Sequence, residues 1–286
     1  MDSNTVLITG GNGQLGRELS LVAEHFAPLR FVATDLPELD ITNAEAIDCC
    51  MANLKPRYVV NCAAYTAVDA AENDEPRALA LNGHAPALLA QACQKHQARL
   101  IHVSTDYVFD GRGHRPYTED ATTAPLSAYG RTKLAGEQAV MQSGIGSVVR
   151  TAWLYSPFGN NFVKTMLRLA GQRPSISVVA DQVGSPTYAH DLAIAIGQMM
   201  ASGKLSAGIY HYTNAGVCSW YDFAHEIMRL TGSPCRIEPI ATEQYPTPAI
   251  RPCYSVLSKS KIQSDFKIDI PHWTTSLEHC LNRLKG

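Results

Sequence analysis

A phenol, an amine and a hydroxyl in this chain have the types and spacing that the reduction of a ketone requires. Tyr129 and Lys133 stand four residues apart in SAYGRTKLAGE (127–137), and Thr105 ends an apolar, strand-like run. Hydride addition to a ketone leaves an alkoxide that needs a proton, and a phenol of pKa about 10 still holds one at neutral pH. An ammonium nearby would lower that pKa, and a hydroxyl could orient the ketone. The spacing by itself also fits an ordinary solvated helix face.

A glycine-rich turn near the N-terminus could bind the hydride donor. An apolar run (5–10) leads directly into GGNGQLG (10–16), and an amphipathic stretch follows. The glycines permit a tight turn and close approach of a pyrophosphate, while the helix N-terminus supplies amide donors. Asp35 ends the next run, where a carboxylate can bind an adenosine ribose; a strand-end or capping aspartate is the alternative. No arginine comes directly after Asp35, so NADH is at least as natural a cofactor as NADPH, and the preference stays open.

Strand-like runs alternate with helix-like segments through the first half of the chain. Short strands that are apolar throughout, separated by helices, are typical of a parallel sheet covered on both faces. We therefore predict an α/β protein with a doubly wound parallel sheet of the Rossmann type. The strand candidates are 5–10, 30–35, 58–63, 100–105 and 147–152, and the helix candidates are 14–26, 43–54, 76–96 and a segment that begins near Ser127.

The second half is less regular and predicts a smaller lobe. Prolines recur after residue 232, and proline-rich chain is extended or loop-like rather than part of a sheet. We expect residues 1–155 to form a dinucleotide-binding domain to which 189–213 return. We expect 156–286 to form mainly a mixed α/β substrate lobe over the carboxyl edge of the sheet. Helix candidates here are 160–170, 189–202 and 219–231, and strand candidates lie near 176–180 and 208–213.

The composition excludes several classes of protein. A formal net charge of −2 gives no basic surface for nucleic acid, and no apolar run approaches the roughly 20 residues needed to span a bilayer. Eight scattered cysteines without a C-x-x-C pair fit reduced thiols, and ten histidines without H-E-x-x-H spacing give little support for a zinc site. Because the N-terminus lacks the pattern of a secretion signal, we expect a cytoplasmic protein without nucleic-acid or membrane partners.

Several stretches together carry a family resemblance. The glycine turn with Thr105 and Tyr129-x-x-x-Lys133 resembles the short-chain dehydrogenase/reductase superfamily. Within it, nearly the whole chain resembles the dTDP-4-dehydrorhamnose reductase family, most selectively in STDYVFDG (104–111), DQVGSPT (181–187) and YPTPAIRP (245–252). The resemblance implies reduction of the C4 ketone of dTDP-4-dehydro-L-rhamnose by NADPH or NADH, the last step of dTDP-L-rhamnose synthesis.

The resemblance also implies a role for each matching residue. Tyr129 would donate the proton, Lys133 would bind the nicotinamide ribose and tune Tyr129, and Thr105 would bind the C4 carbonyl, with Asp106 beside it at the sugar. Trp153 would pack on the sugar nucleotide, with core filling as the alternative. Arg251 would bind the diphosphate, with a surface salt bridge as the alternative. With the glycine turn included, the cofactor contacts would be Gly10, Gly13, Gln14, Leu15, Gly16, Asp35, Asp40, Ile41, Ala64, Tyr65, Thr66, Tyr129 and Lys133.

The chain departs from the family pattern where some members bind magnesium at a dimer contact. Glu18 matches one carboxylate ligand, but His190 stands where a glutamate would be expected, and imidazole serves an oxygen-preferring ion poorly. We therefore predict no metal-binding residues, keep Mg²⁺ only as a candidate cofactor, and leave a homodimer open.

Two other functions stay open from the sequence. One is another nucleotide-linked 4-ketosugar reductase or an epimerase. An epimerase would show no net oxidation of its cofactor. The other is a non-catalytic, NADP-binding regulatory subunit of the methionine adenosyltransferase type. The intact set of Thr105, Tyr129 and Lys133 argues against this last reading, because a binding module has no use for a tuned acid.

Overall fold

A six-stranded sheet in which every neighbouring pair runs parallel forms the centre of the molecule. The computed structural model describes residues 4–285. The strand order is β10-β5-β4-β3-β1-β2, so the chain reverses its direction of winding between β1 and β3, and ligands of such sheets bind at this switch point. The strands are β1 (Thr5–Thr9), β2 (Arg30–Thr34), β3 (Tyr58–Asn61), β4 (Arg99–Thr105), β5 (Gly146–Thr151) and β10 (Gly208–His211).

The central strands are apolar along their length because both faces of the sheet are covered. Successive residues of a strand face opposite sides, so Leu7 and Val59 enter one core whereas Ile8 and Val60 enter the other. All four side chains are fully buried. This pattern confirms the predicted doubly wound α/β fold.

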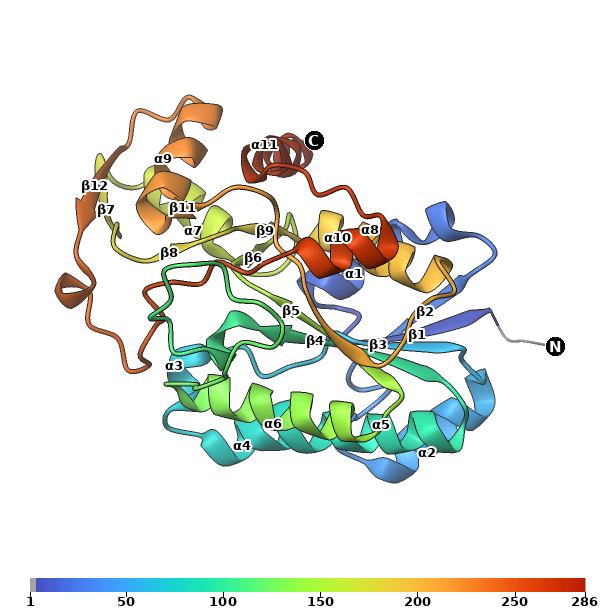
Figure 1. Ribbon diagram of the computed structural model, residues 1–286. Helices are drawn as coiled ribbons and strands as arrows, with labels where there is room; N and C mark the ends of the chain where they lie inside the picture. Colours follow the sequence, from blue (N-terminus) through green and yellow to red (C-terminus); the bar gives the residue numbers. More distant parts are fainter. Residues whose placement is uncertain (1–3, 286) are drawn as a thin grey trace.

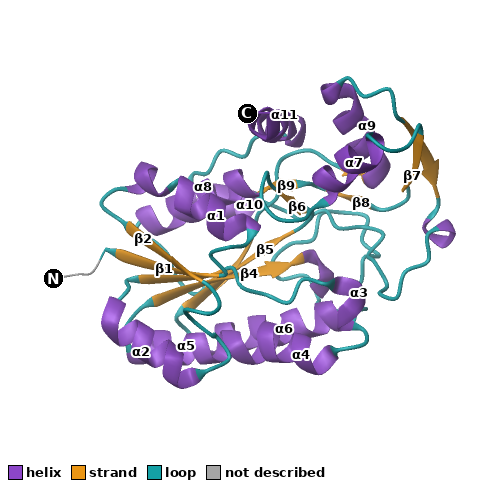
Figure 2. Ribbon diagram, turned by 180° about the vertical axis from the view of Figure 1, so that it is seen from behind, coloured by secondary structure: helices purple, strands orange, loops and turns teal. Residues whose placement is uncertain are grey.

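Helices cover the two faces of the sheet in separate layers (Figures 1 and 2). One layer contains α1 (Gln14–Leu21), the 3-10 turn η1 (Ala23–Phe26), α8 (Ala189–Ala201) and α10 (Ser260–Phe266). The opposite layer contains α2 (Ala44–Leu54), α4 (Glu75–Leu79), α5 (Ala85–Lys95) and α6 (Ala128–Gln142), with the short α3 (Val68–Ala71) at its end. Between α4 and α5 the chain forms a π-helical turn, η2 (Ala80–His84), so the single helical region expected over 76–96 is divided in three.

A smaller lobe lies beyond the carboxyl edge of the sheet, where Figure 2 shows it as a separate group of helices and short strands. Its own core gathers aromatic and aliphatic side chains from three helices and two-stranded ladders. The helices are α7 (Phe162–Ala170), α9 (Trp220–Thr231) and α11 (Trp273–Lys285). The ladders pair β6 (Leu154–Tyr155) with β9 (Thr187–Tyr188), β8 (Val183–Gly184) with β11 (Cys218–Ser219), and β7 (Ser175–Val179) with β12 (Arg236–Ile240).

The segment after residue 232 differs from the expectation of extended or loop-like chain. It contains β12 and, besides the 3-10 turn η4 (Thr242–Gln244), the helices α10 and α11. Ile262 and Phe266 of α10 pack into the same core as α1 and α8, so this helix returns to the sheet. None of the segment's prolines lies inside a helix of the described chain; Pro239 lies within β12, and the others stand between the elements, where proline removes no helical hydrogen bond.

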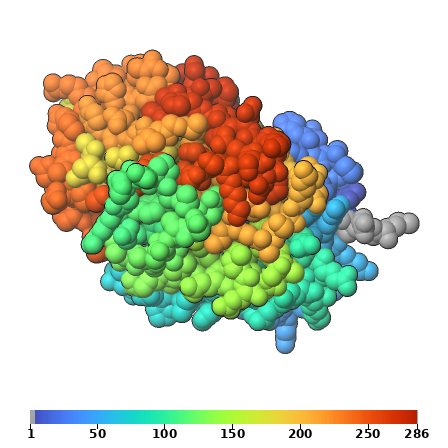
Figure 3. All heavy atoms as spheres, in the orientation of Figure 1, coloured from blue at the N-terminus to red at the C-terminus, as the bar shows by residue number. Residues whose placement is uncertain are grey.

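The loop after β4 joins the sheet to the lobe. It begins with the 3-10 turn η3 (Asp106–Val108), and Tyr254 N donates to Gly111 O at 3.0 Å. Figure 3 shows the green surface of this loop lying against the orange and red surface of the C-terminal third. The division of the chain at residue 155 stays a prediction, although β10 does lie in the sheet beside β5.

Candidate active site

A cavity of about 870 Å³ opens at the carboxyl edge of the sheet. The glycine turn, the ends of β4 and β5 and the N-terminal half of α6 form its walls. The cavity brings together most of the residues that the sequence singles out. They are Gly10, Gly13, Gln14, Leu15, Gly16, Asp35, Asp40, Ile41, Ala64, Thr66, Thr105, Asp106, Tyr129, Lys133 and Trp153.

The backbone of the glycine turn packs against its neighbours more closely than side chains would allow. Gly10 has φ +69, and a Cβ there would lie 2.6 Å from Ala63 N. A Cβ on Gly16 would lie 2.4 Å from Gly10 O, so α1 could not pack as closely on β1. Gly13 is the N-cap of α1 and carries no side-chain cap, which leaves the first amides of the helix free to bind an anion. The glycine turn and the N-terminus of α1 form a cradle that fits the pyrophosphate of a nicotinamide dinucleotide.

Asp35 lies where the sequence predicts it, beyond the end of β2. Its Oδ2 accepts a hydrogen bond from Asn12 N at 2.9 Å, and its Oδ1 accepts one from Leu36 N at 2.9 Å. The carboxylate thus braces the glycine turn while one edge still lines the cavity. Both the capping role and a role in binding ribose are compatible with this position.

Tyr129 stands on the first turn of α6, whose start is fixed by a side-chain cap. Ser127 Oγ accepts a hydrogen bond from Gly130 N at 3.1 Å, and Glu72 Oε1 accepts one from Ala128 N at 2.8 Å. The ring packs edge-on against Tyr107 with centroids 5.4 Å apart. Burial raises the pKa of Tyr129 to about 12, while a hydrogen bond with the Thr105 side chain lowers it in part.

Lys133 lies one turn further along α6 and is almost completely buried. Its Nζ donates to Val103 O at 2.7 Å, which holds the amine against the end of β4. Burial lowers the pKa of Lys133 to about 8, so the amine is mostly an ammonium at neutral pH. The expectation that this ammonium favours the Tyr129 phenolate stays a prediction, whereas burial of the phenol gives its pKa a net rise.

Thr105 and Asp106 lie at the end of β4, facing Tyr129. Thr105 Oγ1 donates to Asp106 Oδ1 at 2.9 Å and accepts from Tyr107 N at 3.2 Å. Asp106 is fully enclosed, and burial raises the pKa of its carboxyl to about 6. Among the described residues, Oδ2 of Asp106 has no hydrogen-bond partner. A buried polar atom without a partner at a cavity wall is available to a ligand hydroxyl.

Asn82 is a site residue that the sequence analysis missed. From the π-helical turn η2, its side chain donates to Tyr65 O at 3.1 Å and accepts from Tyr65 N at 2.8 Å. It also donates to Thr132 Oγ1 of α6 at 3.2 Å. Asn82 therefore fixes the backbone of 64–66 relative to the helix that carries Tyr129. The side chain of Tyr65 itself packs, as Tyr129 does, against a small cluster of buried alanines, and it does not line the cavity.

Trp153 forms the boundary between this cavity and a second one of about 740 Å³. Its backbone has φ +51, and its ring stacks on Trp220 at 3.6 Å between centroids and 11° between planes. Trp220 begins α9 and was not predicted as a site residue. The stack closes one side of each cavity, so Trp153 is more than core filling.

Arg251 lines the second cavity, not the first. It forms a two-point ion pair with Asp69 of α3, Nη1 to Oδ1 at 3.0 Å and Nη2 to Oδ2 at 2.7 Å. The Arg251 side chain is 27% exposed and lines the second cavity. The structure thus shows the salt bridge that the sequence offered as the alternative role.

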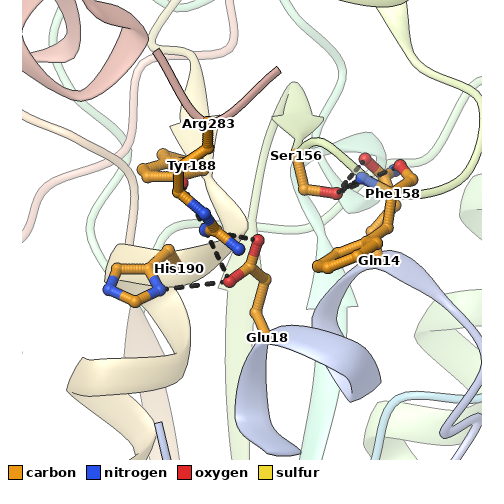
Figure 4. A network of polar contacts seen from close by, with 7 residues as sticks. All are labelled: Gln14, Glu18, Ser156, Phe158, Tyr188, His190 and Arg283. Carbon is orange, nitrogen blue, oxygen red and sulfur yellow. Dashed lines mark hydrogen bonds and ion pairs between the residues drawn. The ribbon is translucent and has the colours of Figure 1, made fainter. Parts of the chain in front are cut away.

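Glu18 does not fit a magnesium ion. Its carboxylate is completely buried and accepts hydrogen bonds from Arg283 Nη1 of α11 at 2.9 Å and from His190 Nδ1 of α8 at 3.1 Å. Figure 4 shows these two side chains converging on the carboxylate from neighbouring helices. The arginine already supplies the positive charge that a cation would bring. Within residues 4–285, no group of three or more His, Cys, Asp or Glu side chains could hold a metal ion.

The same figure shows a second contact of α1, through Gln14. Gln14 Oε1 accepts from Ser156 Oγ at 3.2 Å and from Asn161 Nδ2 at 2.9 Å. Because Gln14 also lines the cavity, these bonds connect the cofactor-facing end of α1 to the lobe.

Comparisons with known proteins agree with this architecture. A family model described as the RmlD substrate binding domain matches residues 4–285. The dTDP-4-dehydrorhamnose reductase of Streptomyces griseus is 43% identical over 286 residues, covering 98% of this chain and 94% of that protein. Among solved structures, a dTDP-4-dehydrorhamnose reductase of Clostridium acetobutylicum superposes with a TM-score of 0.94 at 43% identity, covering 99% of this chain and 100% of that one. That of Bacillus anthracis, in complex with NADP, has a TM-score of 0.93 at 39% identity and covers 99% and 100%.

The parallel sheet, the glycine turn and the cluster of Thr105, Tyr129 and Lys133 define a short-chain dehydrogenase/reductase. More narrowly, the chain belongs to the family of the RmlD substrate binding domain. No helix in the described part of the chain is both long enough and apolar enough to cross a membrane.

Proposed function

We propose that the protein reduces the C4 ketone of dTDP-4-dehydro-L-rhamnose to dTDP-L-rhamnose, the last step of dTDP-L-rhamnose synthesis. The observation that carries the proposal is that Thr105, Tyr129 and Lys133 line the same cavity as the glycine turn. A hydride donor bound along that turn and a ketone held at the end of β4 would meet there. The name of the S. griseus relative supports the choice of substrate.

The chemistry that the chain itself supplies is proton transfer and charge stabilisation. Bound in the cradle, a reduced nicotinamide supplies the hydride. In this proposal the Thr105 hydroxyl turns away from Asp106 Oδ1 and donates to the C4 oxygen, which orients that oxygen and stabilises negative charge on it. Tyr129, whose pKa is about 12, keeps its proton until that charge forms, and Oη then donates the proton to the C4 oxygen. The ammonium of Lys133 favours the phenolate that is left.

The sugar nucleotide, in this proposal, extends from the first cavity past Trp153 into the second. The stacked Trp153 and Trp220 offer an apolar wall to the sugar. Arg251 lines the second cavity and could exchange Asp69 for a diphosphate, because its forked donors match either group. In this account the lobe recognises the nucleotide sugar, and the sheet half binds the dinucleotide.

The cofactor is NADPH or NADH. The B. anthracis structure contains NADP, which supports the phosphorylated form. Asp35 next to the turn supports NADH, since a carboxylate repels a 2′-phosphate. Initial rates with each cofactor decide between them. A cytoplasmic location and a homodimer stay predictions, and light scattering of the purified protein tests the latter.

A second candidate substrate is another dTDP-linked 4-ketosugar. A dTDP-4-keto-6-deoxy-D-glucose reductase of Streptomyces niveus is 42% identical over 275 residues, as similar as the rhamnose-pathway relatives. Both candidates use the same proton donor and differ only in the configuration of the sugar.

The test is a turnover assay with product identification. Purified protein receives dTDP-4-dehydro-L-rhamnose or dTDP-4-keto-6-deoxy-D-glucose, with NADPH and NADH in turn. We expect stoichiometric oxidation of the cofactor and dTDP-L-rhamnose as the product of the first sugar. Turnover only of the second sugar would favour the second candidate, and oxidation of neither cofactor with either sugar would contradict reductase function.

A further inference from the structure

A buried histidine lies directly behind Lys133. His102 is in the middle of β4 between apolar neighbours, and its side chain is completely inaccessible to solvent. Its Nε2 lies 3.3 Å from Lys133 Nζ. It does not line the cavity, so it touches neither the proposed cofactor nor the proposed substrate.

The histidine is the last of three polar side chains that form a row across three strands. Asn61 of β3 is paired with His102 in the sheet, and Thr9 of β1 is paired with Asn61. Paired residues point to the same face, so the three side chains stand side by side. The Asn61 amide contacts His102 Nδ1 at 3.0 Å and Thr9 Oγ1 at 2.7 Å. All three side chains are buried, and the row ends at Lys133.

Hydrogen-bond chemistry restricts what this row can do. An ammonium has three donors and no acceptor, so a charged Lys133 requires Nε2 of the ring to be unprotonated. Burial, reinforced by the nearby Lys133, holds the pKa of His102 well below its usual value, so the ring is neutral with its proton on Nδ1. Asn61 then accepts from Nδ1 through its amide oxygen. In the structure Nδ2 of Asn61 points toward Nδ1 of His102, an arrangement that puts the ring proton on Nε2 and suits an uncharged lysine. Rotating the Asn61 amide by a half-turn places its oxygen toward Nδ1, puts the ring proton there, and suits the charged lysine.

The contacts of Lys133 with β4 also leave one of its three N–H donors for the cavity. One N–H is taken by Val103 O and one by His102 Nε2, both on β4. The third is left for the cavity, which Lys133 lines. We propose that His102 is a positioning residue that holds the Lys133 ammonium in place through Nε2 and thereby extends the pH range over which it stays charged. This inference rests on the proposed function, because it concerns the lysine that assists Tyr129.

Other charged groups near Lys133 act in ways that the test must separate. Glu137 on α6 favours the ammonium but is tied to Arg150 of β5 in a buried ion pair, and Cys62 after β3 contributes in the same direction. Tyr129 and Asp106 face the same cavity. None of these groups contacts His102 in a hydrogen bond, so replacing the ring leaves them in place; it removes the acceptor at Lys133 and the ring's contact with Asn61.

The experiment compares pH profiles of kcat for three variants with the wild type between pH 6 and 10. His102→Phe keeps an aromatic ring of similar size and removes the acceptor, whereas His102→Gln can place an amide oxygen near the position of Nε2. His211→Phe removes another fully buried histidine, one that neighbours Arg150 rather than Lys133. It controls for the loss of a buried ring.

We expect the alkaline limb of kcat, where Lys133 loses its charge, to lie about one pH unit or more lower in His102→Phe than in the wild type. It should stay within about 0.3 unit of the wild type in His102→Gln and His211→Phe. An unchanged limb in His102→Phe, or an equal shift in His211→Phe, would overturn the inference. Wild-type protein that turns over neither sugar would instead refute the proposed function.

A second measurement needs no variant that might fail to fold. The ¹⁵N shifts of the His102 ring in the wild-type protein report its charge and tautomer. We expect a neutral ring throughout pH 6–8 with the proton on Nδ1. A ring that becomes a cation as pH falls from 7 to 6, or one that carries its proton on Nε2 at pH 6, would rule the inference out.

Discussion

The sheet half and the lobe form their shares of the cavity in different ways. The sheet half uses one continuous ladder of six strands, and much of its cavity wall is backbone at strand ends and at the glycine turn. The lobe has only two-stranded ladders, and its wall is made of side chains such as Trp153 and Trp220. A backbone wall is fixed by the fold itself, whereas a side-chain wall can change with single substitutions.

An ion pair in the sheet half and one in the lobe differ sharply in burial, although the sheet half also has exposed pairs such as Arg131 with Glu75. In the sheet half, the ion pair of Arg150 with Glu137 is 2% exposed on both sides. In the lobe, Arg229 pairs with Glu226 along α9 and is 61% exposed. The comparison teaches that changes in the sheet half should cost the fold and the cofactor together, while changes in the lobe should affect the sugar alone. Arg150→Met, Gly16→Ala and Trp220→Ala test this contrast, while Asp106→Asn is the exception in the sheet half because it removes a buried charge.

The largest loss of stability is expected from Arg150→Met. Removal of the arginine leaves Glu137 buried without its partner, and breaking such a pair costs about 3–5 kcal/mol. Urea unfolding at pH 7.5 measures the change. Arg229→Met is the matched control in the lobe, where we expect no measurable change. Equal losses in both variants would break the comparison.

Asp106→Asn should stabilise the protein. The carboxyl ionises near 3.8 when unfolded and near 6 in the fold, so the folded chain holds a proton that the unfolded chain has lost between these values. Stability therefore falls as pH rises from about 4 to 6, and the full cost, roughly 3 kcal/mol, persists above pH 6. We expect the variant to recover most of this at pH 7.5 and none of it near pH 4. A gain that is equal at both pH values would show that ionisation is not the cause.

Gly16→Ala should damage cofactor binding and the fold together. The new Cβ would lie 2.4 Å from Gly10 O and 2.7 Å from Gly11 Cα, so α1 must move away from the turn. Overpacking of this kind costs about 1–3 kcal/mol, and we expect the Kd for NADPH to rise about tenfold or more. Gly171→Ala at the end of α7 is the control, since its Cβ would meet nothing closer than 3.6 Å. NADPH titration by fluorescence measures the Kd of both variants.

Trp220→Ala should have the smallest effect and the most selective one. The change removes the ring on which Trp153 stacks, and aromatic pairs contribute about 0.5–1.5 kcal/mol beyond their buried area. We expect KM for the sugar nucleotide to rise about tenfold while the Kd for NADPH stays within about twofold. Trp220→Phe should restore most of the loss. A matching rise in the NADPH Kd would show that the two halves do not divide the ligands.

The same contrast explains which features the sequence could predict. Strands of the sheet half are apolar throughout because both faces are buried, and that pattern places β1, β3 and β4 within two residues of their observed ends. In the C-terminal part, attention to the prolines hid the helical spacing of Leu277 and Leu281 in α11, although both side chains are buried in the lobe core.

Some site residues could be predicted from local sequence pattern, and others could not. Tyr129 and Lys133 could be paired from their spacing, and Thr105 from its place at a strand end. His102 could not be connected to Asn61, because their contact depends on strand order and register, which no local pattern contains. A salt bridge of Arg251 could be offered, but its partner Asp69, 182 positions away, could not be named.

The central claim is that Tyr129 supplies the proton within a single cavity shared by cofactor and sugar. Tyr129→Phe removes only the phenolic hydroxyl, so the fold and the cradle at the glycine turn should be kept. Single-turnover reduction of dTDP-4-dehydro-L-rhamnose by NADPH measures the effect directly. We predict a rate about 10²–10⁴-fold below that of the wild type, with the Kd for NADPH unchanged within about twofold. A variant that reduces the sugar at the wild-type rate would contradict the account.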